Sequence, residues 1–272
     1  MTEAYLTLET LEKEISHLGQ QLFSADLKKR ARLTNRLLDI CTRAQGKDFL
    51  LIHNPGGWGS TPLEDCLQWE KSVIQGICST IERLGYSWLL TQYFRNGNSW
   101  WSHMRDMKEH ANFFLKGKSF KARIMATELK FITEHAENLK IILIGASQGA
   151  AFSNAVMRQL GDFPQIFSIE LGIFFPHLPR RVVTERTLAI DSNGVMPDPM
   201  VHRNLRAGFK AYITAPFRCI KYRLEGKPQK FTHCINTPGH DYGWEYPEVQ
   251  RQIKDFLNLN FGAKNNTEVI IS

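Results

Sequence analysis

The chain has 272 residues, of which 43% are hydrophobic and 22% are charged, and its formal net charge is +7. This composition indicates a globular protein with one large core or two small ones, and no apolar run is long enough to be an integral membrane segment. The first residues carry acids where a signal peptide carries bases, and no uninterrupted apolar run follows. A cytoplasmic location is therefore expected.

The cysteines and the excess of basic residues exclude several classes of site. The five cysteines are scattered and odd in number, which does not predict a secreted disulfide framework, and none has the CxxC spacing of a zinc site. The basic residues are dispersed, apart from small clusters at residues 28–30 and 180–181. A solvated surface is favoured over a site for nucleic acid, membrane or anionic substrate, because no nucleic-acid motif accompanies the charge.

Residues 1–46 predict a helical N-terminal extension. Leucines and isoleucine recur every three or four residues, at Leu8, Leu11, Ile15, Leu18 and Leu22, and form one apolar stripe. A second helix follows, with Ser24 as its predicted cap and Gly46 as its stop. We favour a helical hairpin packed on the core, and the alternative is a lid or a homodimer contact.

Residues 47–272 alternate between strand and helix patterns. Strands are predicted at residues 49–52, 87–93, 140–146, 166–175 and 187–190. Helices are predicted from a capping box at Thr61 to Leu84, over 120–137 and after Gly149. This order predicts an α/β fold with a mostly parallel sheet flanked by helices, in a single domain that follows the extension.

The segment from Lys140 to Gly149 carries the clearest chemical motif. An aliphatic strand ends in Gly145-Ala-Ser147-Gln-Gly149 and passes directly into a helical pattern. A serine held on a strained turn between a buried strand and a helix is a nucleophile elbow. The hydroxyl needs a base to become nucleophilic, so Ser147 predicts a nearby histidine and its orienting acid.

His240 is the predicted base. It follows a predicted strand at residues 231–236 and precedes a predicted helix at 247–257, where a loop histidine would face the elbow. Surface exposure or structural hydrogen bonding is the alternative role for a lone loop histidine.

The acid has three candidates near the end of a strand. Asp198 is favoured, Asp191 is the alternative and Glu170 is third. The acid would hold the imidazole in the correct tautomer and stabilise the imidazolium.

The oxyanion hole is predicted from backbone N–H groups. One donor is the N–H of Gln148, directly after the nucleophile. The second comes from the glycine-rich turn after the first strand, in which Pro55 has no N–H and Gly57 and Trp58 are the expected donors. The alternative is a turn that only connects strand to helix.

Aromatic residues near these loops are candidates for a substrate pocket. Trp100, Trp101 and Tyr242 are assigned to it, and packing in the core or in a lid is the alternative. A second group, His103, Asp106 and His110, has helical spacing for metal ligands, but nothing else in the sequence completes such a site. We predict neither a metal nor a cofactor.

Together these segments resemble the α/β-hydrolase superfamily, in the order Ser, Asp, His, over roughly residues 47–260. The elbow Gly-Ala-Ser-Gln-Gly-Ala is similar to that of cutinases and carboxylesterases, and His53-Asn54 corresponds to the start of the family's oxyanion turn. Helices replace the family's first two strands, and Asn193 stands where its acid loop often has aspartate.

The resemblance implies a catalytic domain over residues 47–272. This domain would act as a serine hydrolase on a small-molecule ester or thioester, as carboxylesterases and lipases do. The reaction would pass through an acyl-enzyme. A non-catalytic scaffold that binds a ligand or a protein partner, and an acyltransferase or peptidase with the same triad, are the alternatives.

Overall fold

The computed structural model describes residues 8–96, 107–203, 205–226, 234 and 237–264. A five-stranded sheet of order β2-β1-β3-β4-β5 lies at its centre, and all of its strand pairs are parallel. The strands are β1 (Phe49–Asn54), β2 (Trp88–Gln92), β3 (Lys140–Ala146), β4 (Ile166–Leu171) and β5 (Thr187–Ile190). The predicted α/β class and parallel sheet are confirmed.

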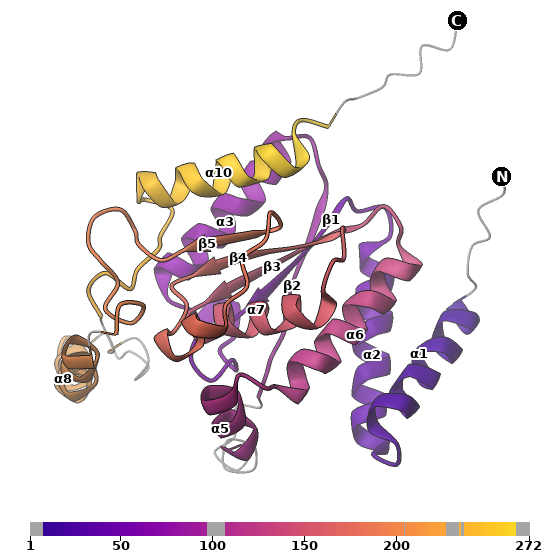
Figure 1. Cartoon of the computed structure of the whole chain (residues 1–272), viewed down its shortest axis with the longest axis horizontal. Helices are drawn as coiled ribbons and strands as arrows, with labels where there is room; N and C mark the ends of the chain where they lie inside the picture. The colour runs from indigo at the N-terminus through magenta and orange to yellow at the C-terminus, as the bar shows by residue number, and fades with distance from the viewer. Residues whose placement is uncertain (1–7, 97–106, 204, 227–233, 235–236, 265–272) are drawn as a thin grey trace, which may run out of the picture.

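Helices cover both faces of the sheet (Figure 1). On one face lie α3 (Gln68–Arg83) and α10 (Pro247–Phe261), and on the other α1 (Leu8–Phe23), α2 (Leu27–Ala44), α6 (Phe120–His135) and α7 (Gln148–Leu160). Shorter or peripheral elements are η1 (Leu63–Asp65), η2 (Phe175–Arg180), α5 (Met107–Lys116) and α8 (Leu205–Leu224). Leu50 and Ile52 of β1 join one core, whereas Phe49 and Leu51 join the other, because side chains alternate along a strand.

The predicted N-terminal helices are present and pack on the core. Leu11 and Ile15 of α1 and Leu33 and Leu37 of α2 belong to the same buried cluster as α6, α7 and the sheet. An ion pair between Arg36 of α2 and Glu128 of α6 adds a polar contact, and burial raises the pKa of Glu128 to about 7. The hairpin is thus an integral layer of the fold.

The start of α2 differs from the prediction. Asp26, not Ser24, caps the helix, and its carboxylate accepts the N–H of Lys29 at 3.1 Å. Ser24 has a φ of +44° and lies in the tight turn between the two helices, so its backbone conformation is not that of a cap. Ser24 and Asp26 are both of residue types that cap helices, and the conformation of the turn determines that Asp26 is the cap.

The start of α3 also differs. The predicted capping box at Thr61 does not open the long helix, which begins seven residues later at Gln68. The N–H of Leu63 donates instead to Oε1 of Gln92 on β2, and the N–H of Cys66 closes a 3-10 turn on the carbonyl of Leu63. A long-range hydrogen bond overrides the local signal.

The predicted strand over residues 231–236 lies almost entirely outside the described residues. Cys234, its one described member, is helical rather than extended. Cys234 forms a disulfide with Cys219 of α8, while Cys41, Cys66 and Cys78 are free thiols. Disulfides are rare in cytosolic proteins, so this bond does not favour the cytoplasmic prediction. In the described part of the chain, every helix is too short or too polar to cross a bilayer.

The strand order changes direction between β1 and β3. The chain leaves β1 through α3 on one face to reach β2, and then crosses through α6 on the opposite face to reach β3. The loops that follow β1 and β3 therefore diverge at the carboxyl edge of the sheet, which is where α/β proteins bind their ligands. The turn after Asn54 and the turn at Ser147 are these two loops.

Candidate active site

Ser147 lies on a strained turn between β3 and α7. Its φ is +53° and its ψ is −112°, which side chains other than glycine rarely adopt. The N–H of Ser147 donates to the carbonyl of Leu171 at 2.8 Å, which ties the turn to the end of β4. A Cβ on Gly149 would lie 2.0 Å from the carbonyl oxygen of Asn54, so only glycine allows this approach of α7 to β1.

His240 and Asp198 form a hydrogen-bonded pair. His240 Nδ1 lies 2.6 Å from Asp198 Oδ2. The carboxylate is fully buried and also accepts the hydroxyl of Tyr242 at 2.5 Å and the N–H of Met200 at 2.7 Å. A neutral imidazole that donates from Nδ1 to this carboxylate carries a free lone pair on Nε2. That is the protonation state a general base requires.

Tyr242 connects the histidine pair to the turn of Ser147. Its ring packs on Gly172, where a Cβ would come within 2.5 Å of the ring, and Gly172 directly follows Leu171. The side chain is fully buried, and the assignment of Tyr242 to a substrate pocket stays a prediction. Burial and the adjacent Asp198 carboxylate raise the pKa of Tyr242, and its hydroxyl therefore stays protonated as a donor.

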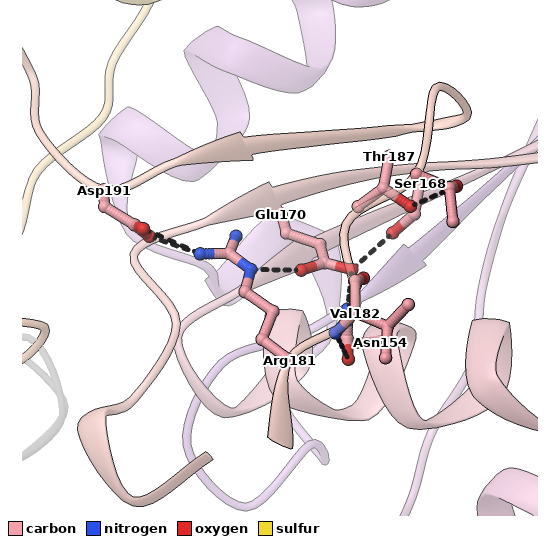
Figure 2. Close-up of polar contacts among 8 residues, drawn as sticks. Asn154, Ser168, Glu170, Arg181, Val182, Thr187 and Asp191 are labelled. Atoms are coloured by element: carbon pink, nitrogen blue, oxygen red, sulfur yellow. Dashed lines mark hydrogen bonds and ion pairs between the residues drawn. The ribbon is translucent and has the colours of Figure 1, made fainter. Parts of the chain in front are cut away.

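The other two acid candidates are held by Arg181 (Figure 2). Its Nη1 contacts both oxygens of Asp191 at 2.8 and 2.7 Å, and its Nε donates to Glu170 at 2.9 Å. Figure 2 shows both carboxylates pointing toward the guanidinium. Glu170 also accepts a hydrogen bond from Asn154, and burial raises its pKa to about 7 despite the neighbouring Arg181. The geometry brings Asp198, and neither Asp191 nor Glu170, to His240.

Gly56 is the residue of the glycine-rich turn that lies against Ser147. A Cβ on Gly56 would lie 3.4 Å from the carbonyl of Ala146 and 3.9 Å from Cβ of Ser147. Gly57, one of the predicted donors, has open space at the same point, and the Trp58 side chain is half exposed. The N–H of Gln148, at the first position of α7, belongs to the donors that a helix leaves without an internal partner.

Arg95 holds the peptide groups of this turn and of the elbow. Its guanidinium donates to the carbonyls of Pro55 at 2.6 Å, Gly57 at 2.9 Å and Gln148 at 2.8 Å. In a trans peptide the N–H points opposite to the C=O, so these bonds turn the N–H groups of Gly56 and Trp58 away from Arg95. Burial lowers the pKa of Arg95 to about 10, which leaves it charged at neutral pH.

Sequence reasoning missed this role of Arg95. The residue lies in the segment Arg95-Asn-Gly-Asn-Ser, which carries no catalytic or binding motif. A buried arginine among three carbonyls is visible only when the loops after β1, β2 and β3 are brought together.

His53, Cys66 and Glu70 form a buried group below the glycine-rich turn. Their potential ligand atoms lie within 4.8 Å of one another. Gln92 Oε1 accepts the N–H of Leu63, so its amide nitrogen faces His53 Nδ1 at 3.0 Å and must donate to it. The ring then carries its proton on Nε2, 3.4 Å from Glu70, and presents no lone pair there to a metal ion. The hydrogen bonds of this group join His53 to Gln92 and the Cys66 thiol to the carbonyl of Thr61.

Several predicted site residues lie elsewhere. Trp100, Trp101, His103 and Asp106 fall outside the described residues, as does the side chain of His110. Trp244 packs over Gly76 and lines a depression of about 580 Å³ on the outer side of α3. The substrate-pocket assignment of Trp100 and Trp101 stays a prediction.

Comparison with known proteins adds no family. No protein-family model matches the chain, and no curated protein matches it either. The function is therefore inferred from the geometry of the site residues.

Proposed function

We propose that the protein is a serine hydrolase of the α/β-hydrolase type, which cleaves a carboxylic ester or thioester through an acyl-enzyme. The observation that carries this proposal is the His240–Asp198 pair, at the same sheet edge as a serine with a φ of +53°. Strained residues cluster at active sites. A buried carboxylate that holds the proton of a histidine on Nδ1 leaves Nε2 free to act as a base, as in a catalytic triad.

Each residue has one role in the proposed reaction. Ser147 Oγ attacks the carbonyl carbon of the substrate while His240 Nε2 takes the hydroxyl proton. Asp198 stabilises the imidazolium that forms. His240 then gives the proton to the leaving alcohol or thiol, and Ser147 is left acylated. Water, deprotonated by His240, releases the acid and restores the serine.

The negative charge on the carbonyl oxygen needs two aligned donors. Gln148 N–H supplies one, and the turn after β1 supplies the other from Gly56, Gly57 or Trp58. The closeness of Gly56 to Ser147 favours Gly56 within this turn. Arg95 supports the turn after β1 by binding the carbonyls of Pro55 and Gly57, and it ties this turn to the start of α7 through the carbonyl of Gln148. Donors fixed before the reaction begins stabilise the transition state most.

Covalent labelling by a fluorophosphonate probe tests the nucleophile. The wild-type chain is expected to take one label, and Ser147→Ala none. Ser79→Ala is the matched control, since Ser79 lies exposed on α3 and should label as the wild type does. A wild-type chain that takes no label, or a Ser147→Ala chain that labels equally well, would contradict the proposal and favour a non-catalytic scaffold.

Substrate preference tests the reaction class. Hydrolysis of p-nitrophenyl esters of increasing acyl length should show an optimum that sizes the acyl site, while the matching anilides are cleaved far more slowly. Preferential cleavage of the anilides would favour a peptidase. Acyl transfer to an added alcohol in preference to water would favour an acyltransferase.

A further inference from the structure

Helix α8 is the element of the described chain that the proposed chemistry does not use. It lies in the sequence between Asp198 and His240, so both of its ends lead to the candidate site. Figure 1 shows it standing off the sheet, on the side toward which the strand arrows point. The disulfide from Cys219 to Cys234 fastens the helix to the segment that returns to His240.

An apolar stripe on α8 faces solvent. Ile213, Phe217, Ile220 and Leu224 follow at spacings of four, three and four, which places them on one helical face. Phe217 is 70% exposed, Leu224 is 83% exposed, and the two isoleucines are each more than half exposed. A surface helix normally turns such a stripe toward the core. Here the small Ala215 is buried instead.

The charge of α8 has one sign. The helix contains five basic residues and no acidic one: Arg206, Lys210, Arg218, Lys221 and Arg223. Lys210 and Lys221 are exposed, and their spacings of seven and four from Phe217 place them along the apolar stripe. Lys221 lies 3.8 Å from Glu225, just past the helix, in an exposed ion pair of the kind that contributes little. Long basic side chains beside exposed large apolar ones form the pattern of a helix that lies in a membrane interface.

We propose that α8 adsorbs to the surface of an anionic lipid bilayer. The stripe from Ile213 to Leu224 would enter the boundary between headgroups and acyl chains, and Lys210 and Lys221 would contact the lipid phosphates. The helix is too polar to cross the bilayer, so it lies in the plane of the interface. A second copy of the chain is a poorer partner, because its α8 would bring five more basic residues and no acidic one to this face.

Adsorption does not depend on the proposed chemistry. Combined with that proposal, it names the substrate class as esters held in a lipid surface, because α8 is joined at both ends to loops that carry Asp198 and His240. This second step rests on the proposed function, whereas binding to vesicles can be measured without any activity.

Vesicle sedimentation with full-length Ser147→Ala protein tests the binding, since this variant leaves the lipid intact. The probes are vesicles of phosphatidylcholine alone and of phosphatidylcholine mixed with phosphatidylglycerol. Binding is expected to the mixed vesicles and to weaken with added salt. The double change Phe217→Glu and Ile220→Glu should lower the partition coefficient by about a hundred-fold. Lys210→Glu with Lys221→Glu should lower it by at least about 25-fold, at roughly five-fold for each lost basic residue.

Leu259→Glu is the matched control. Leu259 is 86% exposed on α10, an apolar residue as open as Leu224 but on another helix, and its change should leave vesicle binding as it is. Circular dichroism and the midpoint of thermal unfolding show whether the variants fold, and exposed positions should shift that midpoint by no more than about 2 °C.

Four results would overturn the proposal. The first three are no binding to mixed vesicles, equal binding to neutral and mixed vesicles, and binding that is unchanged by the substitutions on α8. The fourth is a wild-type protein that binds no vesicles but sediments as a dimer, and that becomes a monomer when Phe217 and Ile220 are changed. Fluorophosphonate labelling of Ser147 is read separately. A chain that is labelled but does not bind vesicles would support the hydrolase proposal and contradict membrane adsorption. A chain that binds vesicles but is not labelled would support adsorption and contradict the hydrolase proposal.

Discussion

Two clusters of carboxylates near the same edge of the sheet have different partners, and in both at least one carboxylate is buried. Asp198 accepts from an imidazole, a phenol and a backbone N–H, whereas Glu170 and Asp191 share the guanidinium of Arg181. The first cluster contains an imidazole, which acts as the base in the proposed reaction. The second is neutralised by a cation that is always charged.

The difference separates a carboxylate available for catalysis from one used for structure. An acid that orients a histidine must direct its charge at the imidazole, and Asp198 has no arginine or lysine among its contacts in the described structure. Asp191 forms an ion pair with Arg181. Through its ion pairs with Glu170 and Asp191, Arg181 joins the end of η2 to β4 and to the end of β5. Breaking each cluster should therefore give opposite effects on activity and stability.

The largest expected effect is that of Asp198→Asn. The amide keeps the shape of the carboxylate but removes its charge and favours the wrong imidazole tautomer, so kcat should fall by about ten-thousand-fold. Steady-state hydrolysis of a p-nitrophenyl ester measures the fall.

Asp191→Asn is the matched comparison for Asp198→Asn. It changes the same chemical group seven residues earlier and should alter kcat by less than about three-fold. A loss of activity as large in Asp191→Asn as in Asp198→Asn would remove the distinction between the two clusters.

Removal of Arg181 should break the second cluster and destabilise the fold. Arg181→Met leaves Glu170 buried without its cation, which costs about 3–5 kcal/mol of unfolding free energy. Catalysis by the molecules that remain folded should stay close to wild type. Urea unfolding followed by circular dichroism measures the free energy, and the rate per folded molecule comes from active-site titration.

The loss in Arg181→Met should depend on pH. Burial holds the pKa of Glu170 at about 7 in the folded state, above its ordinary value of 4.5. Between these values the folded state binds more protons, so the unfolding free energy falls as pH rises from about 4.5 to 7. Without Arg181 the folded pKa rises further, and the fall extends above pH 7. The double variant with Glu170→Gln should lack this slope, and a slope that persists in it would assign the effect to another group.

Arg95→Ala tests the support of the oxyanion hole. Three carbonyls lose their donor and the N–H groups on their far side lose their orientation, so kcat should fall by about 10²–10³-fold while KM changes little. Arg95→Lys should restore only a minor part, because an ammonium cannot span three carbonyls as the planar guanidinium does. Arg251→Ala, an exposed arginine on α10, is the control. A rise in KM with unchanged kcat would assign Arg95 to substrate binding instead.

Much of the fold could be predicted because its signals are local. The apolar runs of β1 and β3 and the stripes of α1, α3 and α10 are each determined by neighbouring residues. The starts of α2 and α3 could not be predicted. The start of α2 depends on a turn in which Ser24 has a positive φ, and the start of α3 depends on a hydrogen bond from Leu63 to Gln92. Such contacts join residues far apart in the sequence or depend on the exact turn.

The site divides in the same way. The serine turn and the histidine loop have sequence motifs, and the distance of an aspartate from the end of a strand gave Asp198 only a small preference. What separates Asp198 from Asp191 is Arg181, a residue that the sequence marks only as part of a small basic cluster. The role of Arg95 could not be predicted for the same reason. Its partners come from other loops, and its neighbours in the sequence carry no sign of them.

The smallest effect is expected from Tyr242→Phe, which removes one of three donors to Asp198. The aromatic ring stays and keeps its packing on Gly172, so the unfolding free energy should fall by only about 1 kcal/mol. With one donor fewer, Asp198 is positioned less firmly against the imidazole, so kcat should fall by no more than about five-fold. Urea unfolding and steady-state hydrolysis of the p-nitrophenyl ester measure the two effects. A kcat equal to that of the wild type would mean that Tyr242 only packs beside the carboxylate, and that His240 and Met200 alone define the first cluster.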